Sequence, residues 1–367
     1  MKKNFQIIFL LLFMPAFTNA GISGVFPDID KMTDSRKASE MIIVYYTEPE
    51  FVRENKPGGV LIMQPHMVKP GELRREISEC SNNDGVPLMV AIDQEGGKIN
   101  RLKKIKGFQN LPSASEMANM DDQAVTKTAF RATRYLRGLG INTNFAPCLD
   151  PSRDYKGRKT FMARLGRSFG NDGDLILKKA GAFIEGVEKG GGAAVVKHFP
   201  GYDVAGNSDK TPEFSDAGIL QIRNTASLFE NISSKCDALM MNNIIYSSID
   251  SLPAVLSPNI TGMARDMCGD SMVIITDDLW AASIRHYVAD KSAGNHKNIT
   301  DSDFEKIVEL AVRAGNDMLL VTYSDKIDIM VEKITTMMKE DPEIRAKVDR
   351  SVGRIFNFKK RFLYGKD

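Results

Sequence analysis

The sequence has few of the residues that mark metal, redox and nucleotide-binding proteins. Four cysteines and four histidines stand among 367 residues, and no CxxC pair or Cys/His cluster has the spacing of a zinc site. There is no GxSxG nucleophile turn, and no glycine-rich loop of the type that holds phosphate groups. We therefore expect no metal and no cofactor.

The sequence also lacks a block of like charge and a long apolar run. Lys and Arg number 49 and Asp and Glu number 47, which gives a formal net charge of +2. This balance lacks the basic excess of nucleic-acid-binding proteins, so we expect no nucleic-acid partner. No apolar stretch has the length of a membrane-spanning helix, so we expect no stable membrane insertion.

The composition is that of an ordinary globular protein. Hydrophobic residues make up 43% of the chain and charged residues 26%, which excludes disordered and collagen-like classes. A chain of this length can bury a large core. Length alone favours two or three domains, but closed α/β barrels often form one longer domain.

The first twenty residues have the order of features of a secretory signal peptide. Lys2 and Lys3 precede an apolar run from Ile7 to Met14, and small residues lead to a cleavage site after Ala20. The sequence thus predicts a signal peptide at residues 1–20, a folded part at residues 21–367, and a periplasmic or secreted protein. The alternative is a buried N-terminal helix.

The four cysteines allow two interpretations. Four thiols permit three complete disulfide pairings, and spacing does not choose among them. In a chain this large we favour buried, unpaired thiols over disulfides. The cysteines are Cys80, Cys148, Cys236 and Cys268.

Short apolar runs rich in β-branched residues alternate with segments of helical periodicity. The predicted strands lie near Met41–Tyr46, Gly59–Met63, Leu88–Ile92, Asn142–Ala146, Ala193–Lys197, Ala238–Ile244, Met272–Thr276 and Asp317–Thr322. The clearest predicted helices are Asp122–Leu139, Leu175–Lys189, Asp216–Ile232 and Asp301–Ala314. Eight alternating strands predict an α/β fold of the TIM-type (β/α)8 barrel, as a single domain. Two extra helices follow between Lys326 and Tyr364, divided near Asp341 and Pro342.

Polar side chains follow five of the predicted strands. In a barrel of this type the chemistry lies where strands end and the following loops begin. The segments are Asp93–Gly97, Asp150, Lys197–Asp203, Asn242–Asn243 and Asp277–Asp278. Carboxylates that face one cleft suit glycosidic cleavage, and Lys, Arg and His suit hydrogen bonds to sugar hydroxyls. The alternative is a set of solvated turn residues.

Several motifs, in order, resemble family 3 of the glycoside hydrolases. Asp93–Gly97 with Arg101 resembles the family's sugar-binding loop. The further matching segments are Asn144–Asp150, Arg167–Gly170, Lys197–Gly201, Thr276–Leu279 and Ala314–Met318. The resemblance is greatest to the single-barrel bacterial β-N-acetylglucosaminidase branch, and it extends from about Met41 to the final helices.

The resemblance implies a role for six residues. Asp277 would be the nucleophile that forms a covalent glycosyl-enzyme, with net retention of configuration. The non-reducing sugar would be held by Asp93, Arg101, Arg167, Lys197 and His198. Asp278 would point away and serve the structure, because strand side chains alternate.

Structural interpretations of three of these residues stay open. Asp277 could cap a helix that begins at Leu279. Lys197 and His198 could be a structural ion pair and a core histidine.

The sequence differs from the family at the position of the family's general acid/base residue. In the hexosaminidase branch an Asp-Ser-His segment follows the KHFPG loop, and that His moves the proton. At equal spacing this chain has Ser208 and Lys210 at the Asp and His positions, and strand six has Asn243 where a His is usual. A Lys with a pKa of about 10.4 is a poor acid near neutrality. Asp209 would reach the site only by a shift of one residue.

Two main hypotheses follow. The first is an exported retaining β-N-acetylhexosaminidase with an altered acid and base, acting on cell-wall or other glycans that contain N-acetylglucosamine. The second is a sugar-binding or regulatory protein on the same barrel without efficient turnover. A third reading is a glucosidase or xylosidase, but that branch usually takes its acid from a second domain, for which this chain is too short.

Overall fold

The computed structural model describes residues 26–362, except residues 81, 84, 237 and 290–298. The predicted signal peptide at residues 1–20 lies outside the described residues. Within the described residues no helix is both long and apolar enough to cross a membrane.

Parallel strands form the centre of the molecule. A six-stranded sheet has the order β15-β1-β2-β5-β6-β9, and a three-stranded sheet has the order β10-β12-β14. The strands are β1 (Ile42–Tyr45), β2 (Gly59–Ile62), β5 (Met89–Ile92), β6 (Thr143–Asn144), β9 (Ala193–Ala194), β10 (Val196–Phe199), β12 (Ala238–Met241), β14 (Val273–Ile275) and β15 (Leu319–Val321). Nearly all their residues are buried, as expected for apolar strands of a parallel sheet that is covered on both faces.

The two sheets follow one another in space. Only Val195 separates β9 from β10. On the other side, Ile275 at the end of β14 forms a parallel bridge with Met318, next to β15, and N of Asp317 donates to O of Ile274 at 2.8 Å. The strand order is therefore consistent with the TIM-type barrel that the sequence predicts. All eight predicted strand regions contain observed strands, although several of these strands are shorter.

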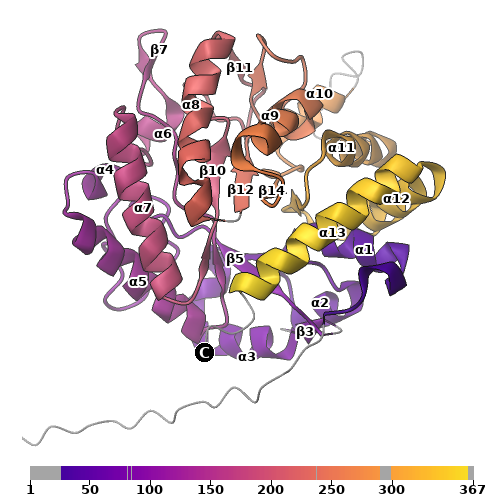
Figure 1. Cartoon of the computed structure of the whole chain (residues 1–367). Coiled ribbons are helices and arrows are strands. Elements are labelled where there is room, and N and C mark those ends of the chain that lie inside the picture. Colours follow the sequence, from indigo (N-terminus) through magenta and orange to yellow (C-terminus); the bar gives the residue numbers. More distant parts are fainter. Residues whose placement is uncertain (1–25, 81, 84, 237, 290–298, 363–367) are drawn as a thin grey trace, which may run out of the picture.

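Helices surround the strands (Figure 1). They are α1 (Asp34–Glu40), α2 (Pro49–Asn55), α3 (Pro70–Cys80), α4 (Ala114–Met117), α5 (Asp122–Gly138), α6 (Phe161–Arg164), α7 (Gly173–Lys189), α8 (Ile219–Ile232), α9 (Pro258–Cys268), α10 (Ala282–Val288), α11 (Asp301–Ala314), α12 (Ile327–Glu340) and α13 (Pro342–Phe362). Side-chain caps define several starts. Asp121 accepts from N of Ala124 before α5, and Thr300 forms a capping box with Asp303 before α11.

Short two-stranded sheets lie outside the central strands. They pair β3 (Asn82–Asn83) with β4 (Val86–Pro87), β7 (Asp154–Tyr155) with β8 (Arg158–Lys159), and β11 (Phe214–Ser215) with β13 (Ile245–Tyr246). The last pair matters for the site, because it fixes the end of the long loop that follows β10. The sequence did not predict these pairs, because two residues carry no periodicity.

Close packing of α5 against α7 depends on a glycine. A Cβ on Gly186 of α7 would lie 2.3 Å from O of Thr126 and 2.8 Å from Cβ of Ala129 in α5. The absence of a side chain thus lets the two helix backbones approach one another.

The C-terminal helix is bound to the first helix by ion pairs. In α13, Lys359 is 1% exposed and pairs with the buried Glu40 of α1. Its Nζ also donates to O of Gly58 at 2.8 Å. Arg345 binds both oxygens of Asp34 at 2.8 Å. The last helix therefore packs on the first (Figure 1), and the division near Asp341 and Pro342 separates α12 from α13 as predicted.

The four cysteines are free and buried. This confirms the interpretation of the cysteines as buried thiols rather than disulfides. They lie in α3, after β6, before β12 and in α9.

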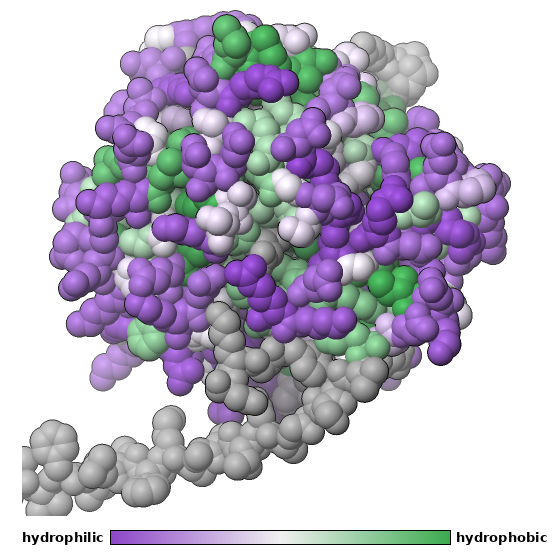
Figure 2. All heavy atoms as spheres, viewed as in Figure 1, coloured by the Kyte–Doolittle hydropathy of each residue, from purple (hydrophilic) through white to green (hydrophobic). Residues whose placement is uncertain are grey.

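Exposed apolar side chains gather at one end of the molecule. Phe214 of β11 is 56% exposed, and Leu220 at the start of α8 is 76% exposed. Figure 2 shows a hydrophobic area at the top of the view, where Figure 1 labels these two elements. The rest of this face is mostly polar.

Candidate active site

A buried lysine joins two carboxylates from another strand end. Nζ of Lys197, in β10, lies 2.6 Å from Oδ1 of Asp93 and 2.7 Å from Oε1 of Glu95. Both acids follow β5, and only 3% of the Lys197 side chain is exposed. The Asn144 side chain fixes this loop, because its amide binds both N and O of Gln94 at 2.9 and 3.0 Å. The cluster thus rests on the ends of three strands.

Two arginines complete the cluster. Arg167 binds Glu95 through two parallel hydrogen bonds, each of 2.8 Å, in the bidentate geometry that gives such pairs direction and strength. Nη2 of Arg101 lies 3.5 Å from Oδ2 of Asp93. The structure therefore brings together Asp93, Arg101, Arg167 and Lys197, as the sequence predicted. It adds Glu95, which lies in the same segment as Asp93 but was not among the six residues with a predicted role.

Opposite charges keep this cluster ionised. Burial by itself would raise the pKa of Asp93 and of Glu95, but the charges of their cationic partners outweigh it and lower both pKa values. Burial would lower the pKa of Lys197, and the two carboxylates raise it instead. Asp93 and Arg101 each keep 18% of the side chain exposed. Charged donors and acceptors are thus available beside the buried ion pairs for binding sugar hydroxyls.

His198 is oriented by a fully buried aspartate. Its Nδ1 donates to Oδ2 of Asp150 at 2.7 Å, and Oδ1 of Asp150 accepts from the backbone N of His198 and of Tyr202. Nε2 of His198 lies 3.4 Å from Nη2 of Arg167. Because Arg only donates hydrogen bonds, Nε2 must accept there, and the ring carries its proton on Nδ1. His198 therefore lies in the same cluster, as predicted.

Cys148 lies beneath the same cluster. Ligand atoms of Cys148, Asp150 and His198 lie within 4.8 Å of one another, a grouping that sequence spacing did not indicate. The thiol donates to Oε2 of Glu95 at 3.4 Å, and burial raises its pKa well above the usual value. A metal would require a thiolate, so these residues fit a hydrogen-bonded network better than a metal site.

Asp277 follows β14 and keeps part of its surface accessible. Its Oδ1 accepts from N of Asp278 at 2.8 Å. The interpretation of Asp277 as a helix cap is wrong, because α10 begins at Ala282 and its N-cap residue is Ala281. The segment after Leu279 turns before it becomes helical, so Asp277 caps no helix.

Asp278 has the structural role that alternation of strand side chains predicts. Its carboxylate accepts from N and Oγ1 of Thr322 at 2.9 and 2.6 Å, and from N of Trp280 at 3.0 Å. These bonds join the loop after β14 to the end of β15. The prediction that Asp278 serves the structure is confirmed.

The surroundings of Asp277 favour its protonated form. Burial is the largest cause that raises its pKa to about 8. The negative charges of Asp209 and Asp278 contribute to this rise, and the positive charge of Lys197 opposes it. Lys197 of β10 is in register with Met240 of β12, and Met240 is in register with Ile275 of β14. Asp277, two residues after Ile275, therefore follows the same end of this parallel sheet as Lys197.

The loop after β10 carries Asp209 toward the loop of Asp277. O of Asp209 accepts from N of Ala282, at the start of α10, at 2.9 Å. On the other side, the Tyr202 hydroxyl accepts from N of Ser208 at 2.7 Å and donates to O of Gly206 at 2.9 Å. The segment is thus fixed at both ends between β10 and α10.

Two buried polar atoms near this loop have no hydrogen-bond partner among the described residues. They are Oγ of Ser208 and Oδ1 of Asn243. These residues stand where the family motif has an Asp and a His, as noted from the sequence. Nδ2 of Asn243 donates to O of Asp278 at 3.3 Å, so the side chain of strand six still lies beside the loop of Asp277.

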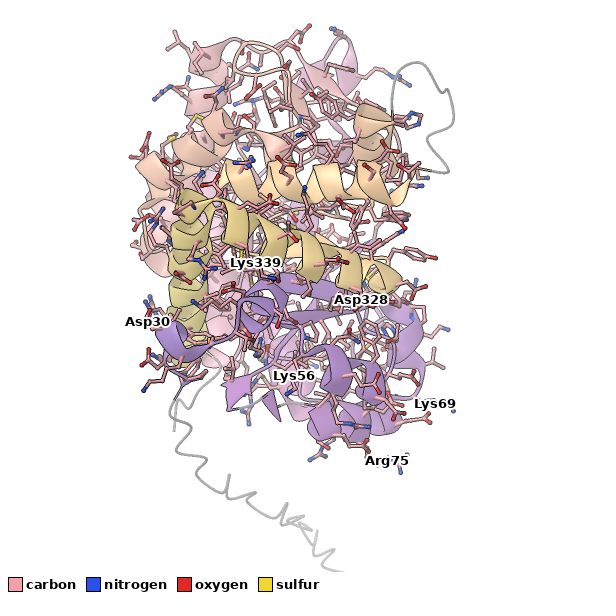
Figure 3. The ribbon with its side chains drawn as sticks, turned by 90° about the vertical axis from the view of Figure 1, so that its right-hand side faces the viewer. Asp30, Lys56, Lys69, Arg75, Asp328 and Lys339 are labelled. Carbon is pink, nitrogen blue, oxygen red and sulfur yellow. The ribbon has the colours of Figure 1, made fainter. Side chains whose placement is uncertain are left out.

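A groove of about 800 Å³ lies away from these residues, between α1, α2 and α12. Figure 3 shows Lys56, Asp328 and Lys339, which line it, on a side formed by the N-terminal elements and the C-terminal helices. Side chains of both charges line it, and it contains none of the predicted site residues.

Comparison with known proteins decides the family. The profile described as "Glycosyl hydrolase family 3 N terminal domain" matches residues 35–358. The chain belongs to this family. The glycoside hydrolase is 30% identical to a β-hexosaminidase of Pseudomonas aeruginosa over 278 residues, which cover 74% of this chain and 77% of that protein. It is 29% identical to a β-hexosaminidase of Methylococcus capsulatus over 282 residues, 75% and 78% of the two chains.

Solved structures agree on the fold of this glycoside hydrolase. A family 3 β-N-acetylglucosaminidase from Paenibacillus sp. str. FPU-7 superposes with a TM-score of 0.78 at 24% identity, over 91% of this chain and 63% of that one. The chain therefore spans less than two thirds of the Paenibacillus protein. A β-N-acetylhexosaminidase from Beutenbergia cavernae has a TM-score of 0.72 at 24% identity, over 89% and 98% of the two chains.

No individual role was predicted from the sequence for Glu95, Asp150 or Cys148. Glu95 and Asp150 stand in the polar segments that follow predicted strands, but position did not reveal what each of them binds. Their partners, Arg167 and His198, are distant along the chain, and only the fold shows which acid pairs with which base.

Proposed function

We propose that the protein is an exported retaining β-N-acetylhexosaminidase that removes terminal N-acetylglucosamine from cell-wall or other glycans. The observation that carries the proposal is that Asp277 follows the same end of one parallel sheet as Lys197, whose ammonium binds Asp93 and Glu95. A nucleophile and a grip for sugar hydroxyls thus share one end of a parallel α/β fold, which we propose closes into a barrel. Family membership and the β-hexosaminidase relatives support this substrate class.

The chemistry follows from the roles of the groups. Asp93, Arg101 and Lys197 would bind the hydroxyls of the sugar and hold its anomeric carbon against Asp277. The ionised carboxylate of Asp277 attacks that carbon, the glycosidic bond breaks, and a covalent ester results. Water then attacks the same carbon and releases the sugar with its original configuration.

The test uses an aryl β-N-acetylglucosaminide and the protein without residues 1–20. Release of the aryl alcohol is expected, with the β anomer of N-acetylglucosamine formed first in an NMR time course. Asp277→Ala should abolish release while binding of N-acetylglucosamine, measured by calorimetry, remains. Asp278→Asn is the neighbouring control, and it should lower stability while keeping measurable turnover.

A second candidate is a sugar-binding protein on the same fold. It is favoured by the presence of Lys210 at the position of the family's acid/base His and of Ser208 at the position of its partner Asp. Binding of N-acetylglucosamine without any release of the aryl alcohol by the wild type would support this candidate. Cleavage of an aryl glucoside or an aryl xyloside, rather than of the aryl N-acetylglucosaminide, would indicate the other branch of the family.

Export is a separate proposal, and it rests on residues 1–20. Expression of the full chain with an export pathway should yield a protein whose mass corresponds to a start at Gly21. A protein that stays inside the cell and keeps its first twenty residues would contradict this proposal.

A further inference from the structure

The proposed reaction needs a second proton-carrying group. In a retaining glycosidase this group protonates the leaving oxygen in the first step and takes a proton from water in the second. The position of the family's acid and base is occupied here by Lys210, and its partner position by Ser208. One carboxyl group stands between them, that of Asp209.

The backbone holds Asp209 beside the nucleophile loop. Its carbonyl accepts from N of Ala282 at 2.9 Å, and its own N donates to Oδ1 of Asn207 at 3.0 Å. The preceding residue is buried and bound to the hydroxyl of Tyr202, while Asp209 itself is exposed. The carboxyl group therefore stands on a fixed backbone and remains open to a substrate.

Charge effects agree with this placement. Among the charges that act on Asp277, that of Asp209 has the largest effect, larger than that of the adjacent Asp278. Asp209 also acts on Asp278 and on Tyr202. These effects agree with the hydrogen bond that holds the Asp209 backbone at the start of α10.

We propose that Asp209 is the general acid and base of this enzyme, paired with Asp277 as the nucleophile. The inference rests on the proposed glycosidase function. The negative charge of Asp209 raises the pKa of Asp277, so these two carboxyl groups favour a single negative charge over two. The retaining reaction requires that charge on Asp277, for attack, and the proton on Asp209, for the leaving group.

The proton and electron pairs balance over both steps. In the first step Asp277 donates an electron pair to the anomeric carbon, the bond from that carbon to the leaving oxygen breaks, and Asp209 gives its proton to this oxygen. In the second step the Asp209 carboxylate removes a proton from water as the water oxygen bonds to the anomeric carbon. The ester bond to Asp277 then breaks, and both residues return to their starting states.

The experiment compares Asp209→Asn with the wild type on two substrates. On a disaccharide of N-acetylglucosamine, whose leaving group needs protonation, the variant should lose about 10²–10⁴-fold in kcat/KM. On the dinitrophenyl glycoside, whose leaving group departs without a proton, kcat/KM should change little above about pH 8, where Asp277 is ionised in both proteins. Added azide should raise turnover of the dinitrophenyl glycoside by the variant and give the β-glycosyl azide, because azide needs no general base.

Two further variants make the result specific. Asp216→Asn alters an exposed aspartate outside the site, which pairs with Lys156 at 2.9 Å, and should retain wild-type rates on both substrates. Lys210→Ala tests the residue that equal spacing would select. If Lys210→Ala shows the leaving-group dependence and the azide rescue, the assignment to Asp209 is overturned.

The outcomes separate this inference from the proposed function. An active wild type whose disaccharide rate survives in Asp209→Asn overturns the assignment of Asp209 alone. An equal loss on both substrates without azide rescue, in a variant with an unchanged circular dichroism spectrum, also overturns it. A folded wild type that binds the sugar but releases no product overturns the proposed function and this inference together.

Discussion

The ammonium of Lys197 lies 2.6 Å from Oδ1 of Asp93, and this ion pair joins β10 to the loop after β5. The same ammonium lies 2.7 Å from Glu95. One buried cation thus binds two acids and joins the ends of two strands.

Replacing Lys197 by Met should destabilise the protein by about 1–3 kcal/mol near pH 7, because Asp93 and Glu95 each lose a hydrogen-bonded cation and keep only Arg101 and Arg167. Pairing lowers the pKa of Asp93 and Glu95. The stability that it supplies is therefore present above their ordinary values of 3.8 and 4.5 and is lost as the pH falls through the lowered values. Urea unfolding from pH 7 to pH 4 should show the difference between variant and wild type begin to shrink. A constant difference would contradict this account.

Removing the charge of Asp209 should make Asp277 easier to ionise. Burial and Asp209 are the two largest causes that raise the pKa of Asp277 to about 8. A nucleophile must be ionised, so activity on the dinitrophenyl glycoside should fall below this pKa. In Asp209→Asn the acidic limb of kcat/KM should move to lower pH, as measured between pH 4 and pH 9. An unchanged limb would mean that the two charges do not interact.

Asp203 should make stability fall between about pH 4 and pH 6. It is buried, its Oδ2 accepts from Ser215 at 2.6 Å, and its Oδ1 has no hydrogen-bond partner among the described residues. Burial raises its pKa from 3.8 to about 6. The folded protein binds this proton more tightly than the unfolded chain, so stability present below pH 4 is lost as the pH rises through 6.

Asp203→Asn removes this titration. The variant should match the wild type near pH 4 and exceed it by up to about 3 kcal/mol above pH 7. Thermal unfolding across this pH range provides the measurement. Ser215→Ala is the matched variant: the hydrogen bond from Ser215 opposes the rise in pKa, so its loss should extend the fall to higher pH. An Asp203→Asn variant that is less stable at pH 8 would show that the carboxylate finds a partner there.

The four thiols should react only after unfolding. All four are buried, and burial raises the pKa of Cys80 to about 11 and of Cys268 to about 12. Since the thiolate is the reactive form, a disulfide reagent near pH 8 should titrate four thiols in denaturant and react far more slowly with the native protein. Fewer than four thiols in freshly unfolded protein would indicate a disulfide.

Sequence patterns were sufficient for much of the fold. α11 has the predicted bounds Asp301–Ala314, because its Thr300 cap and apolar period leave one solution. The predicted strand Asn142–Ala146 shrinks to Thr143–Asn144, since the Asn142 and Asn144 side chains replace part of the ladder with bonds to the neighbouring strand. Hydrogen bonds of this kind, in which a side chain takes the place of the backbone, leave no periodic pattern in the sequence.

Sequence patterns were less informative for the site. Lys197, His198, Asp93 and Asp277 all follow predicted strands, and the family resemblance selected them. The structure joins the first three in one network through Glu95 and Arg167. The pairing of Glu95 with Arg167 joins residues 72 positions apart, and its specificity comes from the folded arrangement. The spacing that places Lys210 at the position of the family's acid/base only counts residues, whereas the structure shows that the backbone of Asp209 is bound to the start of α10.

The contact between Lys359 and Glu40 has a consequence for how the chain is made. Glu40 is 0% exposed. Its Oε2 pairs with Arg36 within α1 at 2.8 Å, whereas its Oε1 pairs with Lys359, 319 positions later, so one of its two oxygens lacks its partner until the last helix arrives. Nascent chains that end before α13 should therefore remain open and susceptible to protease, and completion of the native state must wait for the end of synthesis.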